Sequence, residues 1–385
     1  MLAKFKVIFI ISLISLLPTL FIWLPFFIRA ESVWGIPLPK DGMATIVANY
    51  DGPLFLVVAK TFYNPNLVGN FSFGLPNEYY AAHFPLYPLL IRLIAPLTGF
   101  PYAMLLVTTI SSILALYFFY LLIQKYVERK DALWITLVFS ILPARWLIVR
   151  SVGSTEPLFL AMIIASVYYF KQKKYLLAGT LGFLAQLTKS PGILLFVAYL
   201  LAIVYPKFKE LGDHPSNQLF KLAEIKKILS ISLIPLGLLF VFIFYKIQLN
   251  DFFAYFHSGD NIHLFLLPFQ IFNYSQPWVG TFWLEEVIFV YLFGILGLLK
   301  LIKMKEYDLA WIVGIYFASI LFISHRDIIR YALPIVPFLF VAFADTIVKK
   351  EFKYAMLVLI IPIYLCSLAY ISQNVMPISD WSPLL

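Results

Sequence analysis

Residues 49–60 read NYDGPLFLVVAK, and residues 83–93 read HFPLYPLLIRL. They belong to the segment 40–93, which is the first place in an otherwise apolar chain where carboxylates, a histidine and turn-forming residues occur together. Each combines Asn, Gly or Pro, which favour turns, with an apolar run at helical spacing. They predict a polar segment with short helices, set between longer apolar segments.

The composition of the whole chain indicates an integral membrane protein. The 385 residues are 62% hydrophobic and only 13% charged, with a mean hydropathy of +0.88, far from the balance of a soluble domain. The apolar blocks are about 15 to 23 residues long, which suits helices crossing a hydrocarbon core about 30 Å thick. They lack the alternating pattern of a membrane β-barrel. We therefore expect an all-α polytopic bundle.

The basic residues predict how this bundle is oriented. The net charge is +9, but the Lys and Arg residues fall in separate clusters between apolar blocks and form no single patch that would bind nucleic acid. The positive-inside rule places these clusters in the cytoplasm. The N-terminus is then cytoplasmic and the C-terminus external. The membrane would be the plasma membrane in a bacterium or the endoplasmic reticulum in a eukaryote.

Alternating the apolar blocks across the membrane gives about 11 transmembrane helices in a single domain, 1–385. Residues 29–83 become an external first loop with short juxtamembrane helices, 250–283 a second external loop, and 84–98 an interfacial or re-entrant helix. The one long cytoplasmic loop, 206–228, resembles a basic surface helix. The spans are expected near residues 7–28, 102–123, 132–149, 156–170, 175–189, 191–205, 229–249, 284–299, 308–323, 331–348 and 354–371.

Asp51 is the candidate catalytic residue. A carboxylate at a turn that opens a helix near the membrane surface is held in place and partly desolvated, as a general base requires. The simpler alternative is that Asp51 caps the helix beginning at Pro53. The two roles are compatible.

Other ionisable residues of the predicted external face could bind substrate. His83 precedes a proline-containing turn and could contact a phosphate or an acceptor hydroxyl, or could hydrogen-bond to backbone at the interface. Glu78 lies just before it. Glu156 and five cations lie at external ends of spans, and because charges near membrane depth are costly, an anion-binding role is favoured over snorkelling for some of the cations. The cations are Arg145, Arg150, Lys189, Arg326 and Arg330.

With these residues assembled, the chain resembles the GT-C superfamily of polytopic glycosyltransferases, and within it the PIG-V-like mannosyltransferases. The resemblance covers about residues 45 to 200, and the later half of the chain matches in hydropathy and around Arg330. It rests on four stretches in the family's order: Asn49-Tyr50-Asp51-Gly52, residues 83–93, Gly153-Ser154-Thr155-Glu156-Pro157-Leu158-Phe159, and Leu187-Thr188-Lys189-Ser190-Pro191-Gly192.

The resemblance implies an inverting, metal-independent sugar transfer with no cofactor. A polyprenyl-phosphate hexose, with mannose the expected sugar, would be the donor, and a lipid-linked or other glycan the acceptor. Asp51 would deprotonate the attacking hydroxyl. The implied substrate- and phosphate-binding residues are His83, Glu78, Glu156, Lys189, Arg326 and Arg330.

Two other functions compete with this one. A lipid or solute transporter would show internal repeats and midplane charges, and this chain has neither pattern. A lipid-linked glycan ligase or polymerase usually has a large late loop, and residues 250–283 keep that alternative open.

Overall fold

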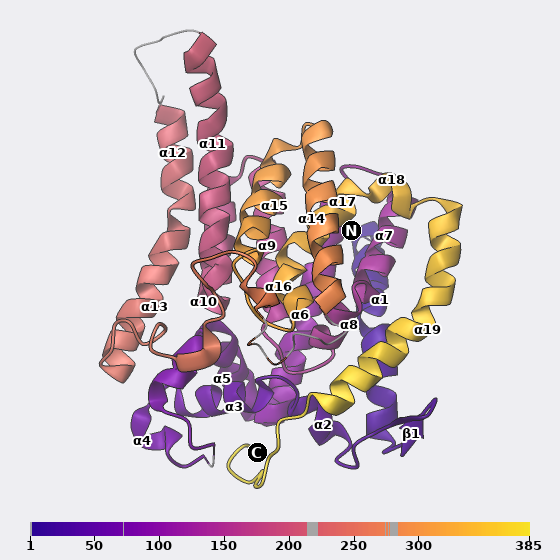
Figure 1. Cartoon of the computed structure of the whole chain (residues 1–385), viewed down its shortest axis with the longest axis vertical. Helices are drawn as coiled ribbons and strands as arrows, with labels where there is room; N and C mark the ends of the chain where they lie inside the picture. The colour runs from indigo at the N-terminus through magenta and orange to yellow at the C-terminus, as the bar shows by residue number, and fades with distance from the viewer. Residues whose placement is uncertain (1, 72, 214–221, 274, 276, 278–283) are drawn as a thin grey trace. The chain divides into compact units, whose positions relative to one another are not determined.

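The computed structural model describes residues 2–71, 73–213, 222–273, 275, 277 and 284–385. Its described part is almost entirely helical, with one short β-hairpin (Figure 1). The chain divides into two compact units, each built from separate stretches of sequence. The first comprises Met1–Ala161, Val241–Asn261 and Thr346–Leu385, and the second comprises Met162–Phe240 and Ile262–Asp345.

The first unit holds two helices long enough to cross a membrane near its N-terminal end, separated by a set of short elements. Its elements are α1 (Leu2–Phe27), the antiparallel strands β1 (Ser32–Val33) and β2 (Ile36–Pro37), α2 (Met43–Val47), α3 (Gly52–Thr61), α4 (Pro65–Val68), the 3-10 helix η1 (Asn77–Ala82), α5 (Leu86–Thr98), α6 (Phe100–Ile123), α7 (Arg129–Ile141), α8 (Ala144–Arg150), the start of α9 (Glu156–Lys171), the end of α13 (Leu233–Leu249), η3 (Gly259–Asn261) and α19 (Lys350–Gln373).

The second unit is a bundle in which α10 packs against α12, and α11 against α15. Its elements are the rest of α9 and α13, α10 (Tyr175–Thr188), η2 (Ser190–Gly192), α11 (Ile193–Asp213), α12 (Leu222–Ile231), η4 (Gln270–Phe272), α14 (Leu284–Lys303), α15 (Tyr307–Ile320), α16 (Ile328–Ala332), η5 (Leu333–Ile335), α17 (Val336–Ala342) and the start of α18 (Ala344–Ile347). Figure 1 shows α11 and α12 running beside each other.

Several helices have the length and composition of membrane spans. Within the described residues four qualify, Phe5–Phe27, Phe100–Ile123, Leu222–Leu249 and Lys350–Gln373, and a bent pair could form a fifth. Other apolar helices are shorter; α10 has 14 residues, about 21 Å at 1.5 Å per residue. The count of about 11 spans stays a prediction, while the expected class, an all-α integral membrane protein, is confirmed.

The segment that was expected to form the first external loop has the predicted short helices. Residues 29–83 contain α2, α3, α4 and η1, and the expected interfacial helix at 84–98 is α5. Gly99, at a φ of 81°, ends α5 and begins α6, so the two helices meet at a sharp turn that an L-residue rarely makes.

One predicted span is broken. Residues 132–149 were expected to form one helix, but α7 and α8 meet at a 74° bend. The carbonyls that the break leaves outside the helical ladder are satisfied by side chains. The fully buried Arg150 guanidinium donates to the Ser140 carbonyl and to both the carbonyl and hydroxyl oxygens of Ser15. The Trp23 indole donates to the Ser151 carbonyl at 2.6 Å.

Other predicted segments also differ from the described structure. The predicted surface helix at 206–228 is made of the end of α11 and the start of α12, and residues 214–221 lie outside the described part. The predicted span at 331–348 is divided among α16, η5, α17 and α18. The loop at 250–283 falls partly outside the described residues.

We expect Arg150→Met to lower the free energy of unfolding by about 3 kcal/mol, because buried carbonyls would lose a charged donor. Denaturant titration in detergent micelles measures this change. Arg129→Met, at an exposed position in α7, is the matched control and should change stability by less than about 0.5 kcal/mol. Equal effects of the two variants would contradict the assigned role.

Candidate functional site

Asp51 lies in a tight turn that leads into α3. Tyr50 adopts a left-handed conformation with φ at 49°, and the Gly52 N–H donates to the Asn49 carbonyl at 3.0 Å. A Cβ at position 52 would collide with the Val47 carbonyl oxygen, so only glycine fits there without a backbone shift. The side chain of Asp51 does not cap α3. Its carboxylate is half-buried and makes no hydrogen bond or ion pair within the described residues.

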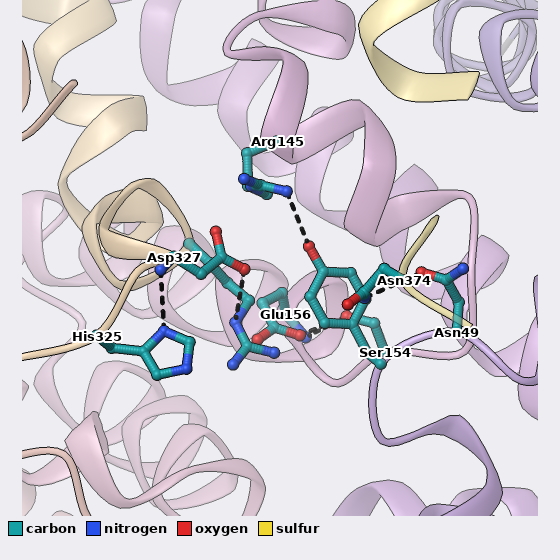
Figure 2. A network of polar contacts seen from close by, with 9 residues as sticks. Asn49, Arg145, Ser154, Glu156, His325, Asp327 and Asn374 are labelled. Carbon is teal, nitrogen blue, oxygen red and sulfur yellow. Dashed lines mark hydrogen bonds and ion pairs between the residues drawn. The ribbon is translucent and has the colours of Figure 1, made fainter. Parts of the chain in front are cut away.

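An aromatic and cationic group holds the residue before Asp51. The Tyr50 hydroxyl accepts a hydrogen bond from Arg145 Nη1 at 3.4 Å (Figure 2). The Arg145 guanidinium, on α8, also lies 3.7 Å from the ring centre of Tyr370 on α19, and the two tyrosine rings are 5.6 Å apart. Arg145 was among the five cations for some of which the sequence favoured an anion-binding role, but nothing local in the sequence connects it to Tyr370.

The residue two before Asp51 is tied to the C-terminal segment. Asn49 is fully buried, and its Nδ2 donates to the Ile371 carbonyl at 2.7 Å. The Asn374 amide donates to Asn49 Oδ1 at 3.3 Å (Figure 2), and the Met376 N–H donates to the Ala48 carbonyl at 2.8 Å. The turn that carries Asp51 is therefore held from both sides by a segment more than 300 residues away in the chain.

A second contact extends this hold along α3. Lys60 Nζ donates to the Pro383 carbonyl at 2.7 Å and also to the Leu385 carbonyl. Partial burial lowers the pKa of Lys60. The segment after α19 thus contacts both ends of the region that bears Asp51.

Glu78 lies on η1, and His83 directly follows η1 in the same unit. The His83 side chain is buried, with its ring edge-on to Phe55 at 4.7 Å, and the Tyr63 hydroxyl donates to its carbonyl. Glu78 is half-buried in the first turn of η1. Burial, and to a smaller extent the neighbouring Tyr79, raises the pKa of Tyr80 to about 12, so this hydroxyl stays neutral near pH 7 and can donate.

Aromatic and polar contacts connect three of the four sequence motifs. Phe55, four residues after Asp51, packs edge-on against both His83 and Tyr87. The Tyr87 and Thr108 hydroxyls are 2.6 Å apart, and Thr108 also donates to the Ser154 carbonyl at 3.4 Å.

The third motif ends this chain of contacts. The Ser154 hydroxyl donates to the Glu156 carboxylate, and Glu156 is only 5% exposed (Figure 2). The Glu156 carboxylate is therefore buried and hydrogen-bonded within its own loop. The segments around Asp51, His83 and Glu156 form one packed region of the first unit.

The three candidate cations belong to the second unit. Lys189 is a half-buried residue in extended conformation between α10 and η2. Arg330 forms an ion pair with Asp327 at 3.4 Å, and the Asp327 N–H donates to His325 Nδ1 at 2.9 Å (Figure 2). Arg326 is exposed in the same turn and has no ion pair in the described part of the chain. Arg326 is therefore the cation in this turn that is best placed to meet an anion from outside.

No metal cluster is present among the described residues, where no group of three or more His, Cys, Asp or Glu side chains could hold an ion. Metal independence stays a prediction from the resemblance.

No family model and no curated protein sequence matches the chain. Solved structures do match. ArnT from Cupriavidus metallidurans bound to undecaprenyl phosphate aligns with a TM-score of 0.54 at 12% identity, covering 91% of this chain and 63% of ArnT. ArnT in the apo state gives a TM-score of 0.55 at 12% identity, with 95% and 64% covered. The chain has the GT-C fold.

A third match is too weak to carry an argument. The Archaeoglobus fulgidus oligosaccharyltransferase aligns at a TM-score of 0.48 with 15% identity, over 96% of this chain and 54% of that one. The GT-C chain described here therefore spans less than two thirds of the length of these neighbours. Its likeness to ArnT shows the GT-C fold that the sequence-based resemblance implied, and leaves the PIG-V-like subtype a prediction.

We expect Asn49→Ala to lower the free energy of unfolding by about 1–3 kcal/mol, since it leaves the Ile371 carbonyl without its donor. It should also make residues 374–385 more sensitive to limited proteolysis. Unfolding titrations and mass spectrometry of the proteolytic fragments measure the two effects. Asn66→Ala, at an exposed position, is the control. Equal protease sensitivity in both variants would contradict the proposal that Asn49 fixes the segment after α19.

Proposed function

We propose that this chain is a membrane glycosyltransferase that moves a hexose from a polyprenyl-phosphate sugar to a lipid-linked or glycan acceptor. Mannose is the proposed sugar, as in the PIG-V-like proteins that the sequence resembles. The GT-C fold supports the reaction class, and the ArnT neighbour bound to undecaprenyl phosphate supports a lipid-phosphate donor. The observation that carries the proposal is the carboxylate of Asp51. It is held in a tight turn and makes no hydrogen bond that caps α3.

In the proposed reaction, Asp51 accepts the proton of an acceptor hydroxyl. The hydroxyl oxygen then attacks the anomeric carbon from the face opposite the phosphate. The bond between the anomeric carbon and the phosphate oxygen breaks, the configuration inverts, and polyprenyl phosphate leaves with the bonding electrons. A half-buried carboxylate with no competing partner suits the first step, because nothing has to be broken before it takes the proton.

The leaving phosphate gains negative charge, so cations stabilise the transition state. Lys189, Arg326 and Arg330 are the proposed phosphate-binding residues. Arg326 would not have to break an ion pair to bind an anion, whereas Arg330 would share its charge between the anion and Asp327. His83 and Glu156 are buried among their own neighbours, and we assign them to shaping the loops around Asp51. Glu78, half-buried on η1, is a proposed contact for the acceptor.

We expect Asp51→Asn to reduce sugar transfer by about 10²–10⁴-fold, the usual contribution of a general base. The measurement is transfer of labelled hexose from polyprenyl-phosphate hexose in membranes, with expression and unfolding checked in parallel. Asp41→Asn, an exposed carboxylate of the same loop, should keep its activity. Turnover like that of the parent protein in Asp51→Asn would exclude Asp51 as the base.

We expect Arg326→Met to weaken binding of polyprenyl phosphate about tenfold, because one charge-assisted contact would be lost. Inhibition of transfer by sugar-free polyprenyl phosphate reports this affinity. Lys303→Met removes an exposed cation of the same unit and serves as the control for net charge. If both variants weaken binding equally, Arg326 has no specific role in binding phosphate.

A further inference from the structure

The second unit contains a cavity of about 240 Å³ that the proposed reaction does not use. At about 30 Å³ per molecule it has room for roughly eight waters, too much for a single trapped water or ion. It lies where α9 ends and α10 and α15 begin, against α11 and α12. The residues that carry the argument are Phe170, Lys173, Ile203, Glu224, Lys227 and Asp308.

The cavity wall combines both signs of charge. Lys171 is already neutralised by an ion pair with Glu306 at 2.5 Å. Lys173 is exposed, and Lys227 lies 3.8 Å from Glu224 Oε1 with its ammonium 5.5 Å from the Tyr175 ring centre. With the carboxylates of Glu224 and Asp308, the lining is close to electrically neutral. A ligand that carries both a positive and a negative group would match it better than a purely anionic one.

A second observation that points to a ligand, apart from the cavity itself, is the side chain of Glu224. It is only 8% exposed, and its Oε2 atom is buried without a hydrogen-bond partner in the described structure. A buried carboxylate oxygen that lacks a donor is costly, because it has lost water and gained nothing in exchange. A ligand ammonium in the cavity would supply the missing donors.

Exposed apolar side chains lie on the helices that line the cavity. Leu176 on α10, Leu222 and Leu229 on α12 and Tyr205 on α11 are large apolar residues with more than half of their surface exposed. In an integral membrane protein such residues contact hydrocarbon, so the cavity lies where the acyl chains of a lipid would already be. Phe170 and Ile203 give its wall an apolar part for the glycerol end of such a molecule.

We propose that this cavity binds the headgroup of an aminophospholipid. The phosphodiester of the lipid contacts Lys173 and Lys227, and its primary ammonium donates a hydrogen bond to the Glu224 carboxylate. A bare divalent cation fits less well, since the lysines would repel it. An anionic lipid without an amine fits less well, since Glu224 would face its negative charge.

This site is separate from the proposed reaction. Lys189 follows the last residue of α10, whereas the cavity is at the first, and the 14 residues between span about 21 Å. The lipid would act as a structural ligand of the second unit, and its binding does not depend on sugar transfer.

Native mass spectrometry of the full-length protein tests the proposal with three lipids of identical acyl chains. Phosphatidylethanolamine has the phosphate and N–H donors, phosphatidylcholine has the same charges but no N–H, and phosphatidylglycerol has the phosphate alone. We expect phosphatidylethanolamine to bind about tenfold more tightly than the other two, the gain from one charge-assisted hydrogen bond. Equal or tighter binding of phosphatidylglycerol or phosphatidylcholine would overturn the proposal, as would no binding.

Two variants assign the selectivity to this cavity. Glu224→Gln should abolish the preference for phosphatidylethanolamine, because the ammonium loses its charged acceptor and phosphatidylglycerol no longer faces a carboxylate, while Lys173→Met should weaken both lipids alike. Glu351→Gln, at an exposed position of α19, should change neither. If Glu224→Gln fails to fold, Lys173→Met and the three-lipid comparison still decide. A preference for phosphatidylethanolamine that survives Glu224→Gln, or lipid binding that Lys173→Met leaves unchanged, would place the binding elsewhere and overturn the proposal.

Discussion

The need to hydrogen-bond every backbone group inside a membrane constrains this structure more than any other interaction. Hydrocarbon offers no partners, so irregular backbone persists only where protein groups supply them. Between α7 and α9 the chain breaks twice, and Arg150 and Trp23 donate to the Ser140 and Ser151 carbonyls there. The third motif, around Ser154 and Glu156, is positioned by this irregular segment. The buried arginine therefore makes possible a loop that a continuous helix would have excluded.

Much of the fold could be predicted from the sequence because membrane helices are encoded locally. The long apolar runs of α1, α6 and α19 exceed what a soluble helix needs, and hydropathy locates them. The short helix α5 was predicted from its prolines and its length. The bend between α7 and α8 was not, because hydropathy is the same on both sides of the break. The two-unit division was also hidden, since each unit is assembled from distant stretches.

The candidate site likewise has features that could be predicted from local sequence and features that could not. Turn chemistry around Asp51 and His83 is local and indicated that these residues were special. Their partners are not local: Arg145 meets Tyr370, and Asn49 meets Ile371, at separations for which no periodicity exists. Burial could not be predicted either. His83 was expected either to contact a phosphate or an acceptor hydroxyl or to hydrogen-bond to backbone at the interface, and neither alternative indicated that its ring packs against Phe55 in the first unit. Conversely, the possible capping role of Asp51 is absent, which leaves its carboxylate available.

The contact between Asn49 and the segment after α19 also constrains the order of events during synthesis. Asn49 emerges from the ribosome 322 residues before Ile371, and N-terminal segments generally fold first. Until α19 is inserted, the turn that bears Asp51 lacks two of its hydrogen-bond partners. The nascent protein thus carries an incomplete turn during the synthesis of 322 further residues, and completes it only when α19 is in place.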